Sequence, residues 1–184
     1  MVAPEGWEVL PIKDITETIV SGGTPSTFIQ EYWNGDIPWM SSGELNLKRI
    51  YTVRKKITQK GLDNSATLFI PRGCILIGLA GQGRTRGTAG INYIPLCINQ
   101  SIAAIFPNPT RFVSEYLYQY LNSKYDELRT LSMGNGGRGG LNLSIIGNLT
   151  ILLPPLSEQL RIAEVLSDTD LYITTLERLI AKKE

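Results

Sequence analysis

Residues 80–90, AGQGRTRGTAG, combine glycine and arginine, the residue types that bind phosphate groups. They follow the apolar run Cys74–Leu79, whose composition indicates a buried strand. A glycine-rich loop after a strand can hold a nucleotide's phosphates, but these glycines are spaced G-x-G-x-x-x-G, and the dinucleotide-binding motif is G-x-G-x-x-G. The loop also lacks the Gly-Lys-Ser/Thr ending of a P-loop. The run that follows, GINYIPLCI, resembles another strand, so we predict a loop between two strands that matches neither motif.

One residue type that carries much enzyme chemistry, histidine, is missing. The chain has no histidine, which excludes Ser-His and Cys-His nucleophile pairs and histidine metal ligands. Cys74 and Cys97 lie within apolar runs and are predicted to be buried free thiols in a reducing compartment. The sequence also lacks an Asp/Glu-x-Lys nuclease arrangement and the Asn-Pro-Pro-aromatic motif of enzymes that methylate exocyclic amino groups. These absences disfavour an enzyme, and the sequence offers no candidate catalytic residue, metal ligand or cofactor.

The charges are unevenly distributed, although the formal net charge is only +1. Residues 45–111 carry ten basic residues and one acidic residue, whereas residues 1–44 carry one basic and seven acidic residues. A segment this basic can attract phosphate although the whole chain is nearly neutral. Charge alone leaves open the alternative that these side chains form an ordinary solvated surface.

Most of the secondary-structure elements that the sequence predicts around these residues are short strands. Strand-like runs occupy residues 7–15, the stretch around Trp39, and residues 67–70, 74–79, 90–98, 101–106 and 149–153. A helix is predicted from Ser114 to a point before residue 132, with Ser114 as its N-cap. A second glycine–arginine loop, SMGNGGRGGLN, occupies residues 132–142. We expect an α/β (α+β) fold with a twisted, mainly antiparallel, β-rich globular domain.

The last part of the chain has a different pattern. Pro154 and Pro155 interrupt it, Ser157 can cap a helix, and Glu158 suits the positive helix end. The following apolar positions repeat with heptad spacing and predict a coiled-coil seam. The seam consists of Ile162, Leu166, Thr169, Ile173, Leu176 and Ile180. We therefore divide the chain into a globular domain, residues 1–153, and a projecting helix, residues 154–184, that serves in dimerisation or subunit docking.

The sequence also predicts where the protein is found. No run reaches the roughly 18 apolar residues that a membrane helix needs. The start, MVAPEGWEVLP, lacks the basic and apolar regions of a signal peptide. We expect a cytoplasmic protein without membrane contact.

Several stretches resemble, in the same order, the target recognition domain of type I restriction–modification specificity subunits. These stretches are SGGTPST, EYWNGDIPWMSSGEL, GTAGI, CINQSIAAI and LNLSII. In addition, LLPPLSEQLRIAEVL followed by DTDLYITTLERLIAKK resembles the conserved spacer region of that family. The resemblance runs from Trp7 to Lys183. Family members normally hold two such domains separated by long helices, so this chain resembles half of a subunit.

The resemblance implies a protein that reads double-stranded DNA and does not catalyse a reaction. Methyl transfer and cleavage would belong to methyltransferase (modification) subunits and, through them, to a restriction subunit, which bring the S-adenosylmethionine and ATP sites. Since helices of the two-domain subunits pair antiparallel, a half subunit would pair with a second copy through its C-terminal helix. The DNA target would then have two half-sites.

The resemblance also gives the glycine–arginine loops a role as candidate DNA contacts. Arginine can hold phosphates or the edge of guanine, and amide side chains can read adenine. Lysine acts as a point charge and suits backbone phosphates. The candidate DNA-binding residues are Gln82, Arg84, Thr85, Arg86, Asn135, Arg138, Lys48, Arg49, Lys55, Lys56, Ser26, Thr27 and Ser42.

Two other classes of protein remain open at this point. A β-rich module for carbohydrate or protein would bind through Trp33, Trp39 and the tyrosines. A nucleotide-dependent enzyme would use the glycine loops. A steep fall of affinity with salt would distinguish DNA binding from the first alternative, because DNA releases counterions when it is bound.

Overall fold

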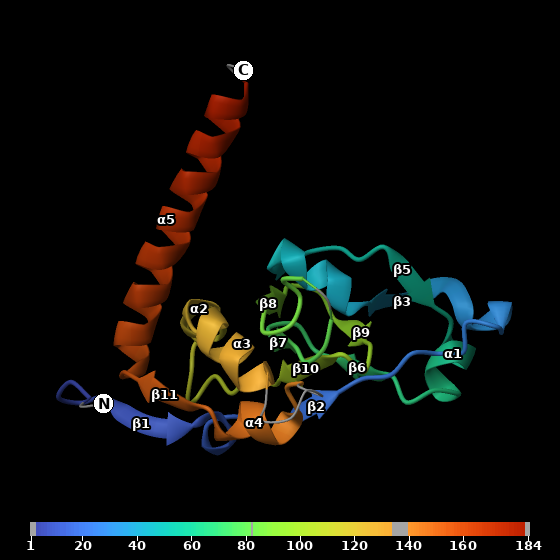
Figure 1. Ribbon diagram of the computed structural model, residues 1–184, viewed down its shortest axis with the longest axis horizontal. Helices are drawn as coiled ribbons and strands as arrows, with labels where there is room; N and C mark the ends of the chain where they lie inside the picture. Colours follow the sequence, from blue (N-terminus) through green and yellow to red (C-terminus); the bar gives the residue numbers. More distant parts are fainter. Residues whose placement is uncertain (1–2, 82, 134–139, 183–184) are drawn as a thin grey trace.

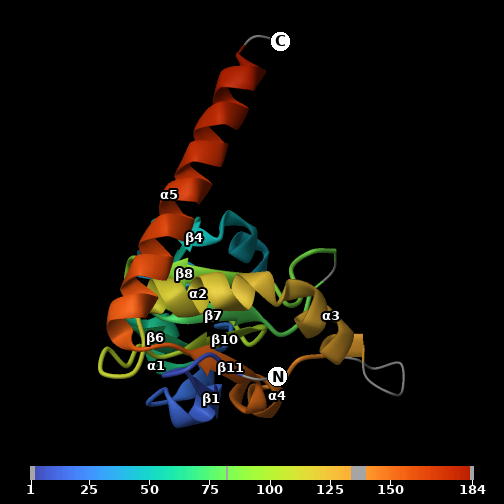
Figure 2. The ribbon, with the colours of Figure 1, turned by 90° about the vertical axis from the view of Figure 1, so that its left-hand side faces the viewer.

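The computed structural model describes residues 3–81, 83–133 and 140–182. The chain forms a globular, sheet-containing part from which one long helix, α5, projects (Figures 1 and 2). The predicted α/β fold with mainly antiparallel sheets and a long C-terminal helix is confirmed.

Within the described residues, the larger sheet has the strand order β2-β10-β7-β8-β4. Its strands are β2 (Ile19–Ser21), β10 (Ile102–Ile105), β7 (Ile75–Gly78), β8 (Ala89–Asn92) and β4 (Arg49–Ile50). Neighbouring strands run antiparallel except β4 and β8, which are parallel. The predicted strands around residues 74–79 and 101–106 are thus present.

A smaller sheet has the order β5-β3-β9-β6 and contains a second parallel pair, β3 with β9. Its strands are β5 (Lys55–Ile57), β3 (Trp33–Met40), β9 (Leu96–Ile98) and β6 (Leu68–Ile70). Strands β1 (Glu8–Pro11) and β11 (Thr150–Leu153) form a separate antiparallel pair. Short helices connect these strands: η1 (Ile12–Asp14), η2 (Gln30–Tyr32), η3 (Ser42–Leu47), α1 (Gln59–Asp63) and α4 (Leu143–Asn148). Of these, η2, η3 and α4 were not predicted from the sequence.

The core follows from the alternation of side chains along the central strands. Ile75 and Ile77 of β7 pack in one apolar cluster with helix α2, whereas Leu76 packs in a second cluster that includes residues of the smaller sheet. Because successive side chains of a strand point to opposite faces, each apolar strand contributes to two layers. The larger sheet is therefore covered on both faces, which explains its continuous apolar runs.

The region predicted as one helix from Ser114 contains two, α2 (Ser114–Ser123) and α3 (Tyr125–Met133). Ser114 is not the N-cap, which corrects the prediction: Val113 occupies that position. The Ser114 hydroxyl instead donates a hydrogen bond to the Gly73 carbonyl oxygen at 2.8 Å. The hydroxyl therefore fixes the start of α2 to the loop before β7.

Helix α5 (Leu156–Ala181) begins next to Pro155, close to the predicted start. Its base is fixed by Gln159, which is 1% exposed. The Gln159 amide donates to the carbonyl oxygens of Pro154 and Arg111, at 2.8 and 3.2 Å, and its oxygen accepts from the Val113 N–H. Residues 171–180 are all exposed, so the second half of the helix projects from the globular part (Figure 1). None of the helices in the described ranges is long and apolar enough to cross a membrane.

Candidate functional site

The first glycine–arginine loop connects β7 to β8, as predicted. It is closed by hydrogen bonds between Gly78 and residues 87–88, at 2.9 and 3.1 Å. Arg129 of α3 donates to the Gly83 carbonyl oxygen at 2.7 Å, and the Tyr125 hydroxyl donates to that of Arg84 at 3.3 Å. The loop is therefore held against α3, and it does not open a helix as a nucleotide-binding loop would.

A glycine is required at position 87 of this loop. Its φ is +81°, and a side chain there would approach Leu128 of α3 at 3.2 Å. Both conditions favour glycine, since other residues rarely adopt positive φ. The glycine thus lets the loop pack closely on the helix, and the exposed Arg84 is carried at the surface.

One cleft brings together predicted candidates from two parts of the chain. We call it the inner basic cleft. It measures about 710 Å³ and is lined by Asn46, Lys48, Arg84, Thr88, Asn122 and Tyr125. Lys48 and Arg84 were predicted from sequence, whereas the four polar residues around them were not. Two positive charges with amide and hydroxyl groups make a surface that can bind phosphate.

A second cleft lies in the smaller sheet, and we call it the distal basic cleft. It measures about 310 Å³ and is lined by Thr27, Trp33, Asn34, Arg54, Lys55 and Lys56. The structure thus unites Thr27, Lys55 and Lys56, three predicted candidates. Arg54 was missed as a candidate, although it belongs to the same basic segment of the sequence.

The other loop candidates have different surroundings. Thr85 is buried. Arg86 is half-buried, and its Nε has no hydrogen-bond partner among the described residues. Ser42 is half-buried in η3, and Ser26 is exposed. Gln82, Asn135 and Arg138 lie outside the described residues.

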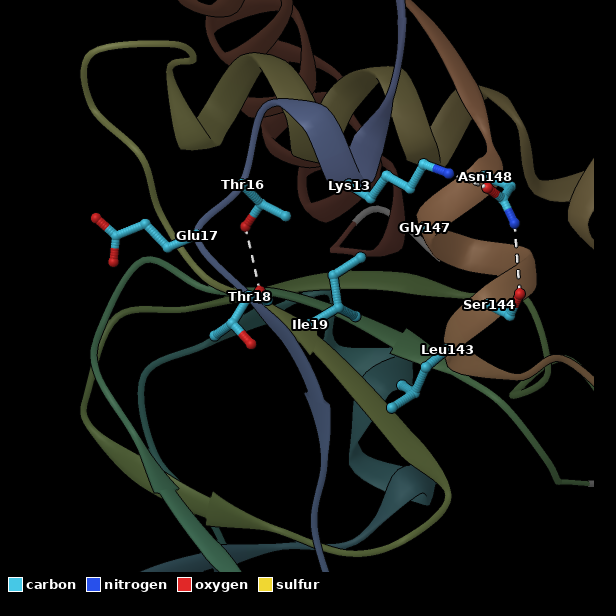
Figure 3. Close-up of a pocket in the computed structure, with 9 residues that line it drawn as sticks. All are labelled: Lys13, Thr16, Glu17, Thr18, Ile19, Leu143, Ser144, Gly147 and Asn148. Carbon is cyan, nitrogen blue, oxygen red and sulfur yellow. Dashed lines mark hydrogen bonds between the residues drawn. The ribbon is translucent and has the colours of Figure 1, made fainter.

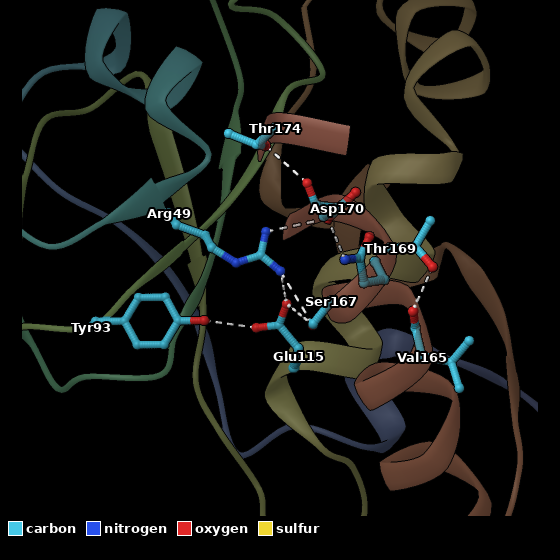
Figure 4. Close-up of polar contacts among 9 residues, drawn as sticks. Arg49, Tyr93, Glu115, Val165, Ser167, Thr169, Asp170 and Thr174 are labelled. Carbon is cyan, nitrogen blue, oxygen red and sulfur yellow. Dashed lines mark hydrogen bonds and ion pairs between the residues drawn. The ribbon is translucent and has the colours of Figure 1, made fainter. Parts of the chain in front are cut away.

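Arg49 is engaged within the protein (Figure 4). Its guanidinium forms an ion pair with Glu115 of α2 and a second one, at 3.5 Å, with Asp170 of α5. Burial alone would lower the pKa of Arg49, but Glu115, Tyr118 and Tyr93 raise it overall. Because two carboxylates already neutralise this side chain, we leave Arg49 out of the proposed phosphate contacts.

Further polar groups extend this contact between helix and domain. The Tyr93 hydroxyl donates to Glu115 at 2.8 Å, and Ser167 donates to the same carboxylate at 3.1 Å. The Gln119 amide donates to Asp170 at 2.8 Å. We call these groups the Arg49 network; its members are Arg49, Tyr93, Glu115, Gln119, Ser167 and Asp170. The network joins β4, α2 and the middle of α5.

The predicted seam of α5 is divided between the domain and the surface. Ile162 is half-buried and packs against the main core, so it is less available to a partner than the sequence suggested. Leu166, Ile173, Leu176 and Ile180 are between 40 and 61% exposed. The Thr169 hydroxyl donates to the Val165 carbonyl oxygen of its own helix at 2.8 Å. An apolar stripe of four large side chains therefore remains uncovered.

A further cleft of about 460 Å³ lies between η1, β2 and α4 (Figure 3). Its one basic residue, Lys13, donates to the Asn148 side chain at 2.8 Å. Among residues 3–81, 83–133 and 140–182, no three His, Cys, Asp or Glu side chains gather where they could hold a metal ion.

Comparison with known protein families gives one match over nearly the whole chain. Residues 4–183 match the family described as "Type I restriction modification DNA specificity domain". The chain is 37% identical over 177 residues to the type I restriction enzyme MjaIX specificity subunit of Methanocaldococcus jannaschii, covering 91% of this chain and 38% of that protein. It is 29% identical to the EcoR124I/EcoR124II specificity subunit of Escherichia coli, covering 81% of this chain and 37% of the relative.

Solved structures share the fold. The HsdS subunit from Thermoanaerobacter tengcongensis superposes with a TM-score of 0.74 at 21% identity, over 97% of this chain and 41% of that one. The type I restriction–modification S subunit from M. genitalium gives a TM-score of 0.65 at 18% identity, over 95% and 41%. The chain thus spans about two fifths of the length of the relatives that it matches.

Proposed function

The chain belongs to the family of type I restriction–modification DNA specificity domains, and we propose that it recognises one half-site of a bipartite DNA target. The family match over residues 4–183 carries this proposal, because it includes both the globular part and α5. We propose that residues 1–153 read the DNA and that residues 154–184 hold this part in place relative to its partners.

The two basic clefts are the proposed contact surface. Lys48 and Arg84 of the inner basic cleft, and Arg54, Lys55 and Lys56 of the distal basic cleft, are all exposed. Lysines there would hold backbone phosphates, whereas an arginine can also form the bidentate pair with guanine. The basic character of residues 45–111 favours this function over a carbohydrate-binding module, which needs no such excess of positive charge.

We propose that catalysis resides in partner subunits. In this arrangement, methyltransferase subunits dock on the chain and a restriction subunit joins through them. The chain itself would position the enzymes on the target and contribute no reacting group. This division of labour agrees with the absence of histidine from the sequence and with the relatives' designation as specificity subunits.

We further propose that two copies pair through the stripe formed by Leu166, Ile173, Leu176 and Ile180. Soluble proteins rarely leave such a stripe uncovered, and a heptad repeat fits a second helix. The 26 residues of α5 extend about 39 Å at 1.5 Å per residue. A two-fold axis across the paired helices would place the two recognition domains at opposite ends, so the target would be an interrupted palindrome.

DNA binding is tested by titrating the chain with fluorescein-labelled duplexes of randomised sequence at several salt concentrations. We expect the logarithm of the affinity to fall linearly with the logarithm of salt, with a slope of about −0.9 for each neutralised phosphate. The target itself would be found by mapping methylation in cells that carry the chain and its methyltransferase partner. Affinity that does not respond to salt, together with the absence of a methylated sequence, would contradict the proposal.

Pairing is tested by sedimentation of the wild type and two variants. Leu176→Asp introduces a charge into the stripe and should give a monomer. Leu171→Asp is the matched control, because Leu171 is also exposed, at 66%, but lies about half a turn away from the seam on α5. A wild type that stays monomeric at tens of micromolar, or equal dimerisation of both variants, would contradict the proposed pairing.

A further inference from the structure

The most exposed large apolar side chain of the described residues lies beside a basic surface. Phe28 is 96% exposed, whereas the next, Leu171 on α5, is 66% exposed. Phe28 belongs to the segment between β2 and β3, which runs to the end of the globular part opposite α5 (Figure 1). The stripe belongs to α5, at the other end of the globular part (Figure 1), so a partner that pairs with α5 does not account for the exposure of Phe28.

The segment that carries Phe28 is held in place by the sheet behind it. The Trp33 indole N–H donates to the Ser26 carbonyl oxygen at 3.0 Å, and that of Trp39 donates to Gly23 at 3.1 Å. The Thr24 hydroxyl donates to the Gln100 side chain at 2.7 Å. The phenyl ring is therefore presented to solvent by a fixed turn.

The residue before the ring, Thr27, lines the distal basic cleft together with Arg54, Lys55 and Lys56. The Lys55 ammonium group lies 5.5 Å from the ring centroid of Trp33 and 5.9 Å from that of Trp39, which fixes its position by cation–π attraction. Arg54 and Lys56 are exposed. An apolar ring thus protrudes next to three positive charges.

The carboxylate nearest to Phe28 in the sequence does not cancel this charge. Glu31, three residues after Phe28, forms an ion pair with Lys60. Strand β3 also carries a bulge between Trp33 and Ile37, with Asn34 at a φ of 62°. Bulges bend a strand and redirect its side chains, and they are frequent next to functional sites. The bulge lies at the rim of the distal basic cleft, which Asn34 lines.

We propose that Phe28 is a wedge that inserts at a base step of duplex DNA while Arg54, Lys55 and Lys56 hold the adjacent phosphates. The inference rests on the proposed function and adds a specific mode of contact to it. A duplex matches the pattern, because its apolar base faces lie between rows of phosphates. A protein partner would need an acidic rim around an apolar pocket. Apolar wedges of this kind unstack a base step and kink the duplex.

The experiment uses the full chain and duplexes rich in TA and CA/TG steps, which unstack most easily. The duplexes carry 2-aminopurine at these steps and a fluorescent donor and acceptor at their ends. We expect the wild type to raise the 2-aminopurine fluorescence and the energy transfer as it binds. Phe28→Ala should bind about five- to a hundredfold more weakly, and at saturation it should give neither signal. Its salt dependence should match the wild type, because the phosphate contacts remain.

Two variants serve as controls. Phe69→Ala removes another phenyl ring, which is 51% exposed on β6, the edge strand of the smaller sheet on the side away from β5. This variant should behave as the wild type. Phe28→Trp keeps a large aromatic ring and should retain binding and both signals. Because Phe28 is almost fully exposed, its replacement should leave the circular dichroism and the melting temperature unchanged.

The outcomes separate the two proposals. If Phe28→Ala keeps the affinity and both signals of the wild type, the wedge is wrong and DNA recognition stands. The wedge is also wrong if this variant weakens binding to the methyltransferase subunits and leaves DNA binding intact, since Phe28 would then contact protein. A wild type that binds none of the duplexes at low salt would contradict both the proposed function and the proposed role of Phe28.

Discussion

Breaking the ion pair between Arg49 and Glu115 should destabilise the fold and loosen α5. The two residues are 66 positions apart, and their side chains are 24 and 20% exposed. Fully exposed ion pairs contribute about 0–1 kcal/mol, whereas hydrogen bonds to charged groups that are shielded from water contribute about 1.5–3 kcal/mol. Because one fifth to one quarter of these side chains remains in solvent, we expect a coupling free energy of about 1–2 kcal/mol.

A double-mutant cycle isolates this coupling. Arg49→Met removes the charge and keeps an apolar stem, and Glu115→Gln keeps the shape of the side chain. The free energies of unfolding of the wild type, the single variants and the double variant would be measured by urea titration followed by circular dichroism. Asp170 should contribute less than Glu115, because its side chain is 49% exposed and its contact with Arg49 is 3.5 Å long.

The exposed pair of Lys60 with Glu31 is the control for this cycle. Their side chains are 60 and 69% exposed, so we expect no measurable coupling. If the Arg49–Glu115 coupling is also immeasurable, the assigned role of the Arg49 network is wrong.

The orientation of α5 provides a second readout. Spin labels on cysteines introduced at Glu177 of α5 and Asp63 of α1 would report the distance between helix and domain. A broader distance distribution in Glu115→Gln is expected, since the hydrogen bond from Ser167 of α5 to position 115 of α2 is weaker without the carboxylate charge. An unchanged distribution would mean that Gln159 and Ala163 hold the helix without the network.

Three further predictions concern the clefts, the thiols and the seam. In a titration with labelled duplexes at several salt concentrations, Lys48→Ala and Arg84→Ala should each reduce the number of neutralised phosphates by about one. Burial raises the pKa of the Cys74 thiol to about 12 and that of Cys97 to about 11. Both thiols should therefore resist a disulfide reagent at pH 8. The free energy of unfolding should fall as the pH rises above 9, because the thiols ionise at a lower pH in the unfolded chain than in the folded protein. Thr169→Leu should strengthen self-association by about 1–2 kcal/mol in sedimentation, because it fills the polar position of the seam.

Each of these predictions has its own control. Lys13→Ala, in the cleft beside α4, should leave the salt dependence of DNA binding unchanged. Urea-unfolded protein should react with the disulfide reagent at once, and equally fast reaction of the native protein would show that the thiols are accessible. Equal self-association of Thr169→Leu and the wild type would place Thr169 outside the interface.

Elements whose cause is local could be predicted from the sequence alone. The apolar strands β7 and β10, the loop between β7 and β8, and the projecting helix α5 were all predicted. Alternation, proline breaks and heptad spacing act between residues close in the chain, so they can be read without a fold. Cys74 and Cys97 were likewise correctly predicted to be buried free thiols, because each lies within an apolar run; the structure describes both cysteines of the chain.

Which polar residues share a site depends on long-range packing. Arg49 follows Lys48 in sequence, yet Lys48 lines the inner basic cleft and Arg49 pairs with Glu115 and Asp170. Serine is a favoured N-cap residue, but the Ser114 hydroxyl donates a hydrogen bond to the carbonyl oxygen of Gly73, 41 residues away. Thr27, the residue before Phe28, shares the distal basic cleft with Lys55, which follows it by 28 positions. The sequence around a charged or aromatic residue is the same whether its side chain contacts a carboxylate, another ring or solvent. Only long-range packing selects among these partners.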